Sequence, residues 1–547
     1  MATITIDGQV CEFDGKASIL QVALDNGFEI PHYCYHPGMS VVASCRICLA
    51  EIAQPNPRND NQVELVPKLV PTCQTPAVDG MQVYTKSPKS IANQKAVMEY
   101  LLVHHPLDCP VCDQAGECYL QDYSFKYGRG KSRFAEAKIK QPKKNLGQYV
   151  MLYADRCIMC TRCVRFTREI SGTAELGVFG RGNREQIDIF PGKSLDNELS
   201  GNVIDICPVG ALLDKDFLMS MRVWNLDKAS SIDGLTASGD NISIEYNENE
   251  GKVYRVKPRT NMDVNKWWIS DEIRYGWKHI HHQDRLRSPL TKVHGSHEEC
   301  DWNQAYSQAT RRLQQIVTEH GPGSLAIMVS PMLASEEAYL LGKLARAIDD
   351  KAPLAVGPVP FAGQDKSFPG GYTIYAEKAP NARGVRRALE LVADRDDVLE
   401  ADALLARLKD GGVKAVIATG NYPSTWATDE LAAALAEPYT VLIDTLPSDL
   451  FDKVELVLPG ATWAEKAGTF ENVHNRIQSF NQAIPVIELA KTEGQIALDL
   501  LAWLGQRDNE RYDAKRIRSE MGGVFVTDVH HPPISLKQVS DMQYVEL

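Results

Sequence analysis

The amino-acid sequence predicts a multidomain protein of the α+β and α/β classes. At 547 residues the chain is too long for one hydrophobic core and should divide into about three to five domains. Twelve of its thirteen cysteines lie within the first 207 residues, whereas residues 280–490 alternate apolar strands with helical segments. We therefore expect a cysteine-rich front half of small mixed domains, followed by a back half built on a parallel sheet.

The composition argues against several classes of protein. Apolar residues make up 44% of the chain and charged residues 24%, so neither a disordered nor a fibrous protein is indicated. The net charge of −12 is spread along the chain, which makes nucleic acid an unexpected ligand. There is no apolar run of about 18 residues, and the first residues read as a strand rather than a targeting peptide. We expect a soluble chain in the reducing cytoplasm, where abundant cysteine indicates metal binding rather than disulfides.

Residues 1–80 are expected to form a small sheet-and-helix domain with one metal centre. Two apolar runs flank Asp7-Gly8, a strong hairpin signal, and Ser18 can cap a short helix that stops near Gly27. A hairpin followed by a helix begins a β-grasp sheet. The C-x10-C-x2-C spacing with a distant fourth cysteine keeps the plant-type 2Fe–2S pattern with a longer first loop. A zinc site is the alternative, although zinc ribbons usually have two C-x2-C pairs. The four cysteines are Cys34, Cys45, Cys48 and Cys73.

Residues 81–146 place two histidines beside three cysteines. The stretch SIANQKAVMEYLLVHH, 90–105, has apolar residues at helical spacing, and we expect Pro106 to end a helix that delivers a histidine next to the cysteine loop. A four-iron cluster or a closed zinc site needs four ligands, and the loop supplies three. His105 is close enough to be the fourth, and the spacing alone leaves His104 as a competitor. The three cysteines are Cys109, Cys112 and Cys118.

Residues 147–220 carry the most specific pattern. The run CIMCTRCVRF and the later GNVIDICPVGAL supply C-x2-C-x2-C and a remote Cys-Pro, as in bacterial ferredoxins that bind a 4Fe–4S cluster. Zinc rarely uses such a triplet. The ligands expected here are Cys157, Cys160, Cys163 and Cys207.

Two cysteines remain outside these sets. Cys11 lies among apolar neighbours on a predicted strand and reads as a small buried residue, and Cys300 lies in a polar stretch. Three iron–sulfur sites in one chain indicate electron transfer, because such centres connect a two-electron donor with a distant acceptor. We find no general base or nucleophile and therefore expect no catalytic residue.

The order of the three patterns resembles the large iron–sulfur subunit (the 75 kDa type) of respiratory NADH:quinone oxidoreductase, complex I. The resemblance is dense from residue 1 to about 280, in HHPLDCPVCDQAGEC, CIMCTRCVRF and GNVIDICPVGAL. It implies one 2Fe–2S cluster on the first set of cysteines and a 4Fe–4S cluster on each of the other two sets. In that family the ligand histidine directly precedes a proline, so the resemblance implies that the ligand here is His105 rather than His104.

Two features of the chain depart from the family. The 49–72 insertion is longer than expected and reads as a hairpin that should leave the cluster in place. Some bacterial members carry a fourth cysteine set after residue 228, where this chain reads SSIDGLTASGDNI, and we expect no further cluster.

The back half resembles the molybdopterin oxidoreductases. Residues 221–278 read as a small cap domain lacking cluster ligands, with two strands around a Gly turn. Residues 279–500 read as an α/β domain, and LPGATWAEKAGTFENVHNRIQ, 458–478, looks like a segment of that family. No thiolate is placed to bind molybdenum, so we expect a scaffold without metal. Residues 501–547 are expected to form an extended C-terminal arm or a disordered tail.

The resemblance implies an electron-transfer subunit that relays electrons from NADH and FMN on a partner subunit towards quinone, coupled in the whole complex to proton translocation. The implied partners are the flavin subunit, a 2Fe–2S subunit, a ferredoxin-like 4Fe–4S subunit and the quinone-site subunits, at the cytoplasmic face of the bacterial inner membrane. Iron-only hydrogenases and formate dehydrogenases share such a front end but need more cysteine in the back half. The hydrogenase diaphorase subunit should stop near residue 240, and a zinc-stabilised scaffold remains the third alternative.

Overall fold

The computed structural model describes residues 2–393 and 397–531, which divide into two compact units. The first holds residues 2–225 with 368–372, and the second holds 226–367 with 373–531. No helix among these residues is long and apolar enough to cross a membrane.

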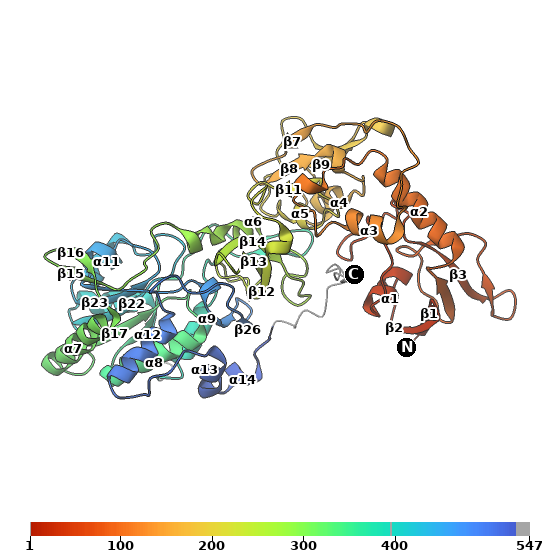
Figure 1. Cartoon of the computed structure of the whole chain (residues 1–547). Helices are drawn as coiled ribbons and strands as arrows, with labels where there is room; N and C mark the ends of the chain where they lie inside the picture. The colour runs from red at the N-terminus through yellow and green to blue at the C-terminus, as the bar shows by residue number, and fades with distance from the viewer. Residues whose placement is uncertain (1, 394–396, 532–547) are drawn as a thin grey trace. The chain divides into compact units, whose positions relative to one another are not determined.

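The first unit begins with a six-stranded sheet beside one short helix (Figure 1). The predicted hairpin forms, and its turn holds Asp7 and Gly8 at φ 48° and 92°. The Ser18 hydroxyl caps the helix by accepting a hydrogen bond from Gln21 N at 3.2 Å. The strands run β2-β1-β6-β3-β4, with β5 on β3, so the 49–72 insertion is a hairpin as predicted. The elements are β1 (Ala2–Ile6), β2 (Gln9–Phe13), α1 (Ile19–Asp25), β3 (Leu49–Asn56), β4 (Gln62–Leu65), β5 (Val70–Pro71) and β6 (Met81–Tyr84).

The helix before the second cysteine set is shorter than predicted. Helix α2 (Pro88–Leu102) ends before both histidines, so they lie in the loop that follows it rather than on the helix. Pro106 contributes to this end, because it has no N–H to donate to the carbonyl of Leu102, four residues earlier, and its ring would clash with that carbonyl in a helix. The loop continues through a 3₁₀ turn, Cys109–Val111, to α3 (Tyr119–Tyr127).

The rest of the first unit holds the third cysteine set between short elements. A three-stranded antiparallel sheet has the order β11-β8-β7, and β9 pairs with β10 in a hairpin. The elements are β7 (Lys143–Asn145), β8 (Val150–Tyr153), a 3₁₀ turn (Ala154–Arg156), α4 (Arg162–Glu169), β9 (Leu176–Phe179), β10 (Gln186–Ile189), α5 (Asn202–Asp205) and β11 (Leu212–Asp214).

The second unit opens with a three-stranded antiparallel sheet and continues into an eight-stranded sheet. The small sheet, β12-β13-β14, contains the predicted pair around Gly251 and one further strand. Its elements are β12 (Asp227–Ile232), β13 (Asn241–Asn247), β14 (Lys252–Pro258) and the short helix α6 (Asp271–Tyr275). The large sheet has the order β16-β15-β24-β23-β22-β17-β18-β21. Its strands from β24 to β21 are parallel, and β15 and β16 add an antiparallel edge. The expected α/β class is confirmed.

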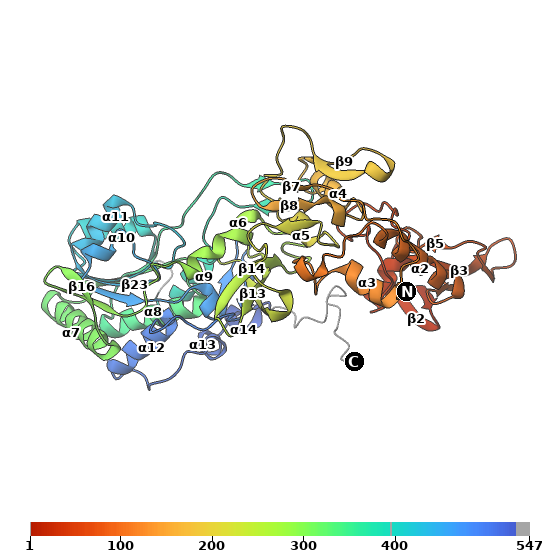
Figure 2. The same ribbon diagram turned by 45° about the horizontal axis from the view of Figure 1, so that its top comes forward.

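Both faces of this sheet are covered by helices (Figures 1 and 2). Leu325, Ile327 and Val329 of β17 pack into one core with α7, α8, α9 and α12, while Ala326 and Met328 pack into the other with α10 and α11. Strands buried on two faces read as continuous apolar runs, which made them recognisable in the sequence. The elements are β15 (Leu290–Val293), β16 (Ser296–Glu299), α7 (Trp302–His320), β17 (Leu325–Val329), α8 (Ser335–Ile348), β18 (Leu354–Val356), α9 (Ala382–Leu389), β21 (Val398–Leu399), α10 (Ala401–Lys409), β22 (Ala415–Thr419), α11 (Asp429–Ala436), β23 (Tyr439–Asp444), β24 (Leu456–Pro459) and α12 (Glu493–Trp503).

The C-terminal segment differs from the extended arm expected at 501–547. After the hairpin of β25 (Gly468–Glu471) and β26 (Ile477–Phe480), and after α12, the chain forms α13 (Ala514–Met521) and α14 (Val524–Thr527). Ile517 and Phe525 are buried in the sheet's core, and this apolar contact fixes a segment that reads as polar. Residues 532–547 of the expected arm lie outside the described residues.

Candidate metal centres

The four cysteines of the first set converge in loops around the edge of the first sheet. Cys34 follows α1, Cys45 and Cys48 immediately precede β3, and Cys73 follows β5. Hydrogen bonds from Cys45 and Cys73 lower the pKa of the Cys34 thiol, and a bond from Cys73 lowers the pKa of Cys48 to about 7. These contacts link all four thiols, and three of the four cysteines are buried.

Three residues of the second set, His105, Cys109 and Cys118, line a cavity of about 330 Å³. Cys112 is buried beside them, facing Gly210, where a Cβ would stand 2.3 Å from the Cys112 sulfur. Only glycine therefore fits at position 210.

The two histidines of this loop differ in their surroundings. His105 Nδ1 is buried and has no hydrogen-bond partner among the described residues. Burial, followed by the charge of Arg156, lowers the pKa of His105 to about 4. A neutral, unpartnered imidazole is the form that binds metals. His104 is exposed and does not line the cavity.

The third set lines one small cavity, of about 20 Å³, with all four of its sulfur-bearing residues. Cys157 and Cys160 lie between β8 and α4, Cys163 lies in the first turn of α4, and the remote Cys207 lies between α5 and β11. Met159 and Thr161 take positive φ angles of 54° and 58° to turn the triplet inward, a strained conformation typical of functional loops. Burial raises the pKa of Cys160 to about 11, as it raises that of the other three thiols.

One hydrophobic core joins members of all three sets. It includes Cys34, Cys118 and Cys160, with Cys45, Cys157 and Cys207 packed against it. The remaining cysteines have ordinary places: Cys11 is buried on β2, as predicted, and Cys300 packs partly buried against the core of the second unit. Among the described residues, no three His, Cys, Asp or Glu side chains converge closely enough to hold one metal ion.

Buried arginines give an independent test of whether anionic clusters fit here. Arg162 and Arg165 are 6% and 8% exposed, and their guanidinium groups donate to backbone carbonyls. Neither has a carboxylate partner in an ion pair within the described part of the chain. Buried cations require compensating negative charge, and thiolate-bound iron–sulfur clusters would supply it. The residues of all three sets fit such groups.

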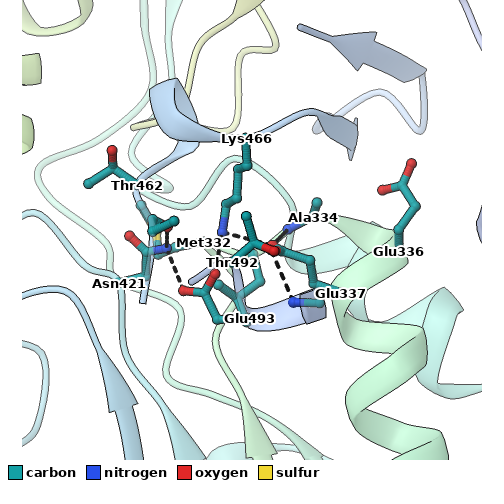
Figure 3. Close-up of polar contacts among 12 residues, drawn as sticks. Met332, Ala334, Glu336, Glu337, Asn421, Thr462, Lys466, Thr492 and Glu493 are labelled. Carbon is teal, nitrogen blue, oxygen red and sulfur yellow. Dashed lines mark hydrogen bonds and ion pairs between the residues drawn. The ribbon is translucent and has the colours of Figure 1, made fainter. Parts of the chain in front are cut away.

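The second unit carries a different buried cluster, at the carboxyl ends of its parallel strands (Figure 3). The Lys466 ammonium contacts Glu337 at 2.8 Å and Glu493 at 2.7 Å, and all three side chains are 0% exposed. Asn421 donates to the other oxygen of Glu493 at 3.0 Å. Glu337 begins α8 and Glu493 begins α12, so the carboxylates lie near the helix ends where phosphate groups often bind.

Three further carboxylates are buried at this edge. Glu336 bonds Arg518, Glu465 bonds Arg285, and Asp444 accepts bonds from Asn421 N and Trp426. With Glu337 they make four carboxylates beside three cations among the described residues, because burial raises the pKa of Glu493 to about 8 and leaves it largely protonated at neutral pH. The edge therefore disfavours an anionic ligand.

The Lys466 cluster predicts a pH-dependent stability for the second unit. Burial first, and then the charge of Glu337, raise the pKa of Glu493 to about 8 from its ordinary 4.5. A carboxyl group whose pKa is higher in the folded than in the unfolded chain stabilises the fold. Its contribution is complete below the pKa of the unfolded chain and is lost as the pH rises through the pKa of the folded chain. Relative to Glu493→Gln, the native chain should lose on the order of a few kcal/mol of unfolding free energy between about pH 4.5 and 8. Urea unfolding at several pH values measures this. The exposed Glu488→Gln is the control, and parallel pH curves for Glu493→Gln and native chains would contradict the prediction.

Comparison with known proteins covers most of the chain. Residues 1–88 match the 2Fe-2S iron-sulfur cluster binding domain, and 94–133 match the NADH-ubiquinone oxidoreductase-G iron-sulfur binding region. Residues 147–213 match the NADH-quinone oxidoreductase subunit 3, ferredoxin-like domain. Residues 285–356 and 369–502 match molybdopterin oxidoreductase.

Curated relatives agree with these matches. The NADH-ubiquinone oxidoreductase 75 kDa subunit of Reclinomonas americana is 39% identical over 358 residues, covering 65% of this chain and 50% of the relative. The mitochondrial NADH-ubiquinone oxidoreductase 78 kDa subunit of Neurospora crassa is 42% identical over 315 residues, covering 57% and 40%. Over these residues the chain is similar to the large iron–sulfur subunit that both relatives are named for. It spans about half the length, or less, of the curated relatives it matches.

Two further comparisons concern the 226–278 segment and a solved structure. Residues 226–278 match the NDSU1/NuoG-like 4Fe-4S domain, yet this segment contains no cysteine. A chain of the NAD+-reducing NiFe-hydrogenase in the H2-reduced state is 29% identical, with 41% of this chain and 91% of that chain covered and a TM-score of 0.35, too low to relate the folds.

Proposed function

We propose that the chain is the electron-transfer subunit of a respiratory NADH:quinone oxidoreductase. On this proposal, NADH gives up two electrons at FMN on a partner subunit, and the electrons pass singly towards quinone, which takes two electrons and two protons. The observation that carries the proposal is the convergence of three ligand sets in one core of the first unit, in a homologue of the large iron–sulfur subunit. Iron–sulfur groups supply one-electron chemistry when bound.

The ligand roles follow from the loops described above. We assign Cys34, Cys45, Cys48 and Cys73 to a 2Fe–2S cluster and the other two sets to 4Fe–4S clusters. His105 completes the second set, because its Nδ1 is buried and unpartnered beside Cys109 and Cys118. Most of these cysteines are buried or partly buried, while Cys109 is exposed.

We also propose that the second unit binds no molybdenum cofactor. The 226–278 segment has no cysteine, Cys300 is its unit's lone thiol in the sequence, and buried carboxylates fill the edge of the sheet where a pterin phosphate would bind. These residues do not fit the cofactor that a molybdopterin-type fold implies. The unit then acts as a scaffold.

Metal analysis of the whole chain tests the assignment. Anaerobically purified chain should contain about ten irons, from one two-iron and two four-iron clusters, and should be coloured, with three sets of electron paramagnetic resonance (EPR) signals on reduction. A colourless chain loaded with zinc would refute the redox function and leave a zinc-stabilised scaffold.

The partners and the location are proposed on the same basis. We expect the flavin subunit that oxidises NADH, a 2Fe–2S subunit, a ferredoxin-like subunit and quinone-site subunits to bind this chain, at the cytoplasmic face of a bacterial inner membrane. Purification of the tagged chain from membranes should bring along an NADH-oxidising flavoprotein. Its consistent absence, with the clusters intact, would argue against this assembly.

A further inference from the structure

Arg156 is a buried residue that contacts the loops of two different ligand sets. Its Nε and Nη2 donate to Asp108 Oδ2 at 3.1 and 2.9 Å, and Asp108 immediately precedes Cys109. Its Nη1 donates to the carbonyl of Gly210, in the loop that follows Cys207, at 3.4 Å. The guanidinium also lies over the Tyr153 ring, 4.0 Å from the centroid. Arg156 therefore joins the second loop to the third.

Arg162 and Arg165, on α4, join the first loop to the third in the same way. Arg162 donates to the carbonyl of Ile206, beside Cys207, at 3.2 Å, and to that of Tyr35, beside Cys34. Arg165 donates to the carbonyl of Cys34 itself and to that of Cys160 at 3.5 Å. It also donates to the Ser40 carbonyl at 2.5 Å.

The positive charge of each of these three arginines acts on both of the ligand loops that the arginine contacts. An arginine stays protonated in proteins, and a buried charge is weakly screened. A reduced cluster carries one more negative charge than an oxidised cluster, so a nearby cation favours reduction and raises the reduction potential.

The geometry points to Arg156, Arg162 and Arg165 as positioning residues, which we call the arginine bridges. They fix the three ligand loops relative to one another. Each of them also raises the reduction potentials of the two centres whose loops it contacts. This inference rests on the proposed function, since it requires clusters in the three sets. It predicts paired effects, because each bridge spans two loops.

An EPR-monitored redox titration of the anaerobically purified whole chain tests the bridges. Arg165→Gln should lower the reduction potentials of the Cys34 and Cys157 centres. At the native midpoint, the ratio of reduced to oxidised cluster should fall several-fold at each of these centres. At the His105 centre the same ratio should stay within twofold of the native value. A tenfold change corresponds to about 59 mV for one electron. Arg156→Gln should instead shift the His105 and Cys157 centres together. The matched control is Arg168→Gln, an exposed arginine on the same helix, which should shift none.

The remaining outcomes are decisive. Three intact signals with unshifted potentials, or equal shifts of all three centres, would overturn the inference but leave the proposed function standing, whereas a native chain without three signals would overturn the proposed function. If Arg165→Gln assembles no clusters, Arg165→Lys keeps the charge but has one donor nitrogen in place of the two that hold the Ser40 and Cys34 carbonyls. In Arg165→Lys the ratio of reduced to oxidised cluster should stay within twofold of the native value at both centres. The magnetic interaction between the Cys34 and Cys157 centres should become weaker. An unchanged interaction would overturn the bridging role.

Discussion

Replacing His105 with alanine is expected to remove one four-iron centre, while His104→Ala leaves all three centres in place. Three cysteines leave a four-iron cluster one ligand short, and His105 is the imidazole that lines the cavity with a buried, unpartnered Nδ1. Iron content should fall from about ten to about six atoms per chain. The exposed His104 should tolerate the same change.

Iron analysis and low-temperature EPR of both variants, purified without oxygen, measure this difference. The signals of the Cys34 and Cys157 sets serve as internal standards, because they should persist in both variants. Equal loss of the signal in the two variants would contradict the assignment of His105.

Replacing Lys466 with methionine is expected to destabilise the second unit by about 3–5 kcal/mol, the usual cost of removing one partner from a buried ion pair. The change leaves Glu337 and Glu493 buried at 0% exposure without their shared cation. Because domains are stable by only about 5–15 kcal/mol, much of the unit's stability would be lost.

Urea unfolding followed by tryptophan fluorescence reports on this unit, since seven of the eight tryptophans lie after residue 225. Lys515→Met, at an exposed position on α13, controls for the loss of a lysine and should leave the midpoint unchanged. Adding Glu337→Gln and Glu493→Gln to Lys466→Met should recover part of the loss, because a neutral set has no uncompensated charge. A midpoint for Lys466→Met equal to that of native chain would rule out a stabilising role for the cluster.

The sequence predicted the parts of this molecule that depend on short spacings. The cysteine patterns, the Asp7-Gly8 hairpin and the Ser18 cap are each encoded within a few residues, and the apolar runs identified the parallel strands. The choice between His104 and His105 needed the resemblance, because one residue of spacing separates them. Their exposures differ because the chain leaves the helix at Leu102, which the apolar periodicity did not reveal.

The buried charges could not be read from the sequence. Lys466 looks like any surface lysine, since its partners Glu337 and Glu493 come from distant helices, and Arg165 looks like Arg168 three residues later. The fold alone determines that Lys466 and Arg165 are buried while Arg168 is exposed. The arm at 501–547 was predicted as extended because its polar composition conceals Ile517 and Phe525, which pack into the core.

The wide separation of Cys163 and Cys207 has a consequence for biosynthesis. A ribosome adds about 5–20 residues per second, so the triplet emerges on the order of several seconds before its closing partner, while the chain for the β9–β10 hairpin is still being made. During that interval three thiols stand uncovered, open to oxidation or to scavenging of the wrong ion. Of the three proposed centres, this one therefore waits longest for its last ligand, because Cys207 lies 44 residues after Cys163.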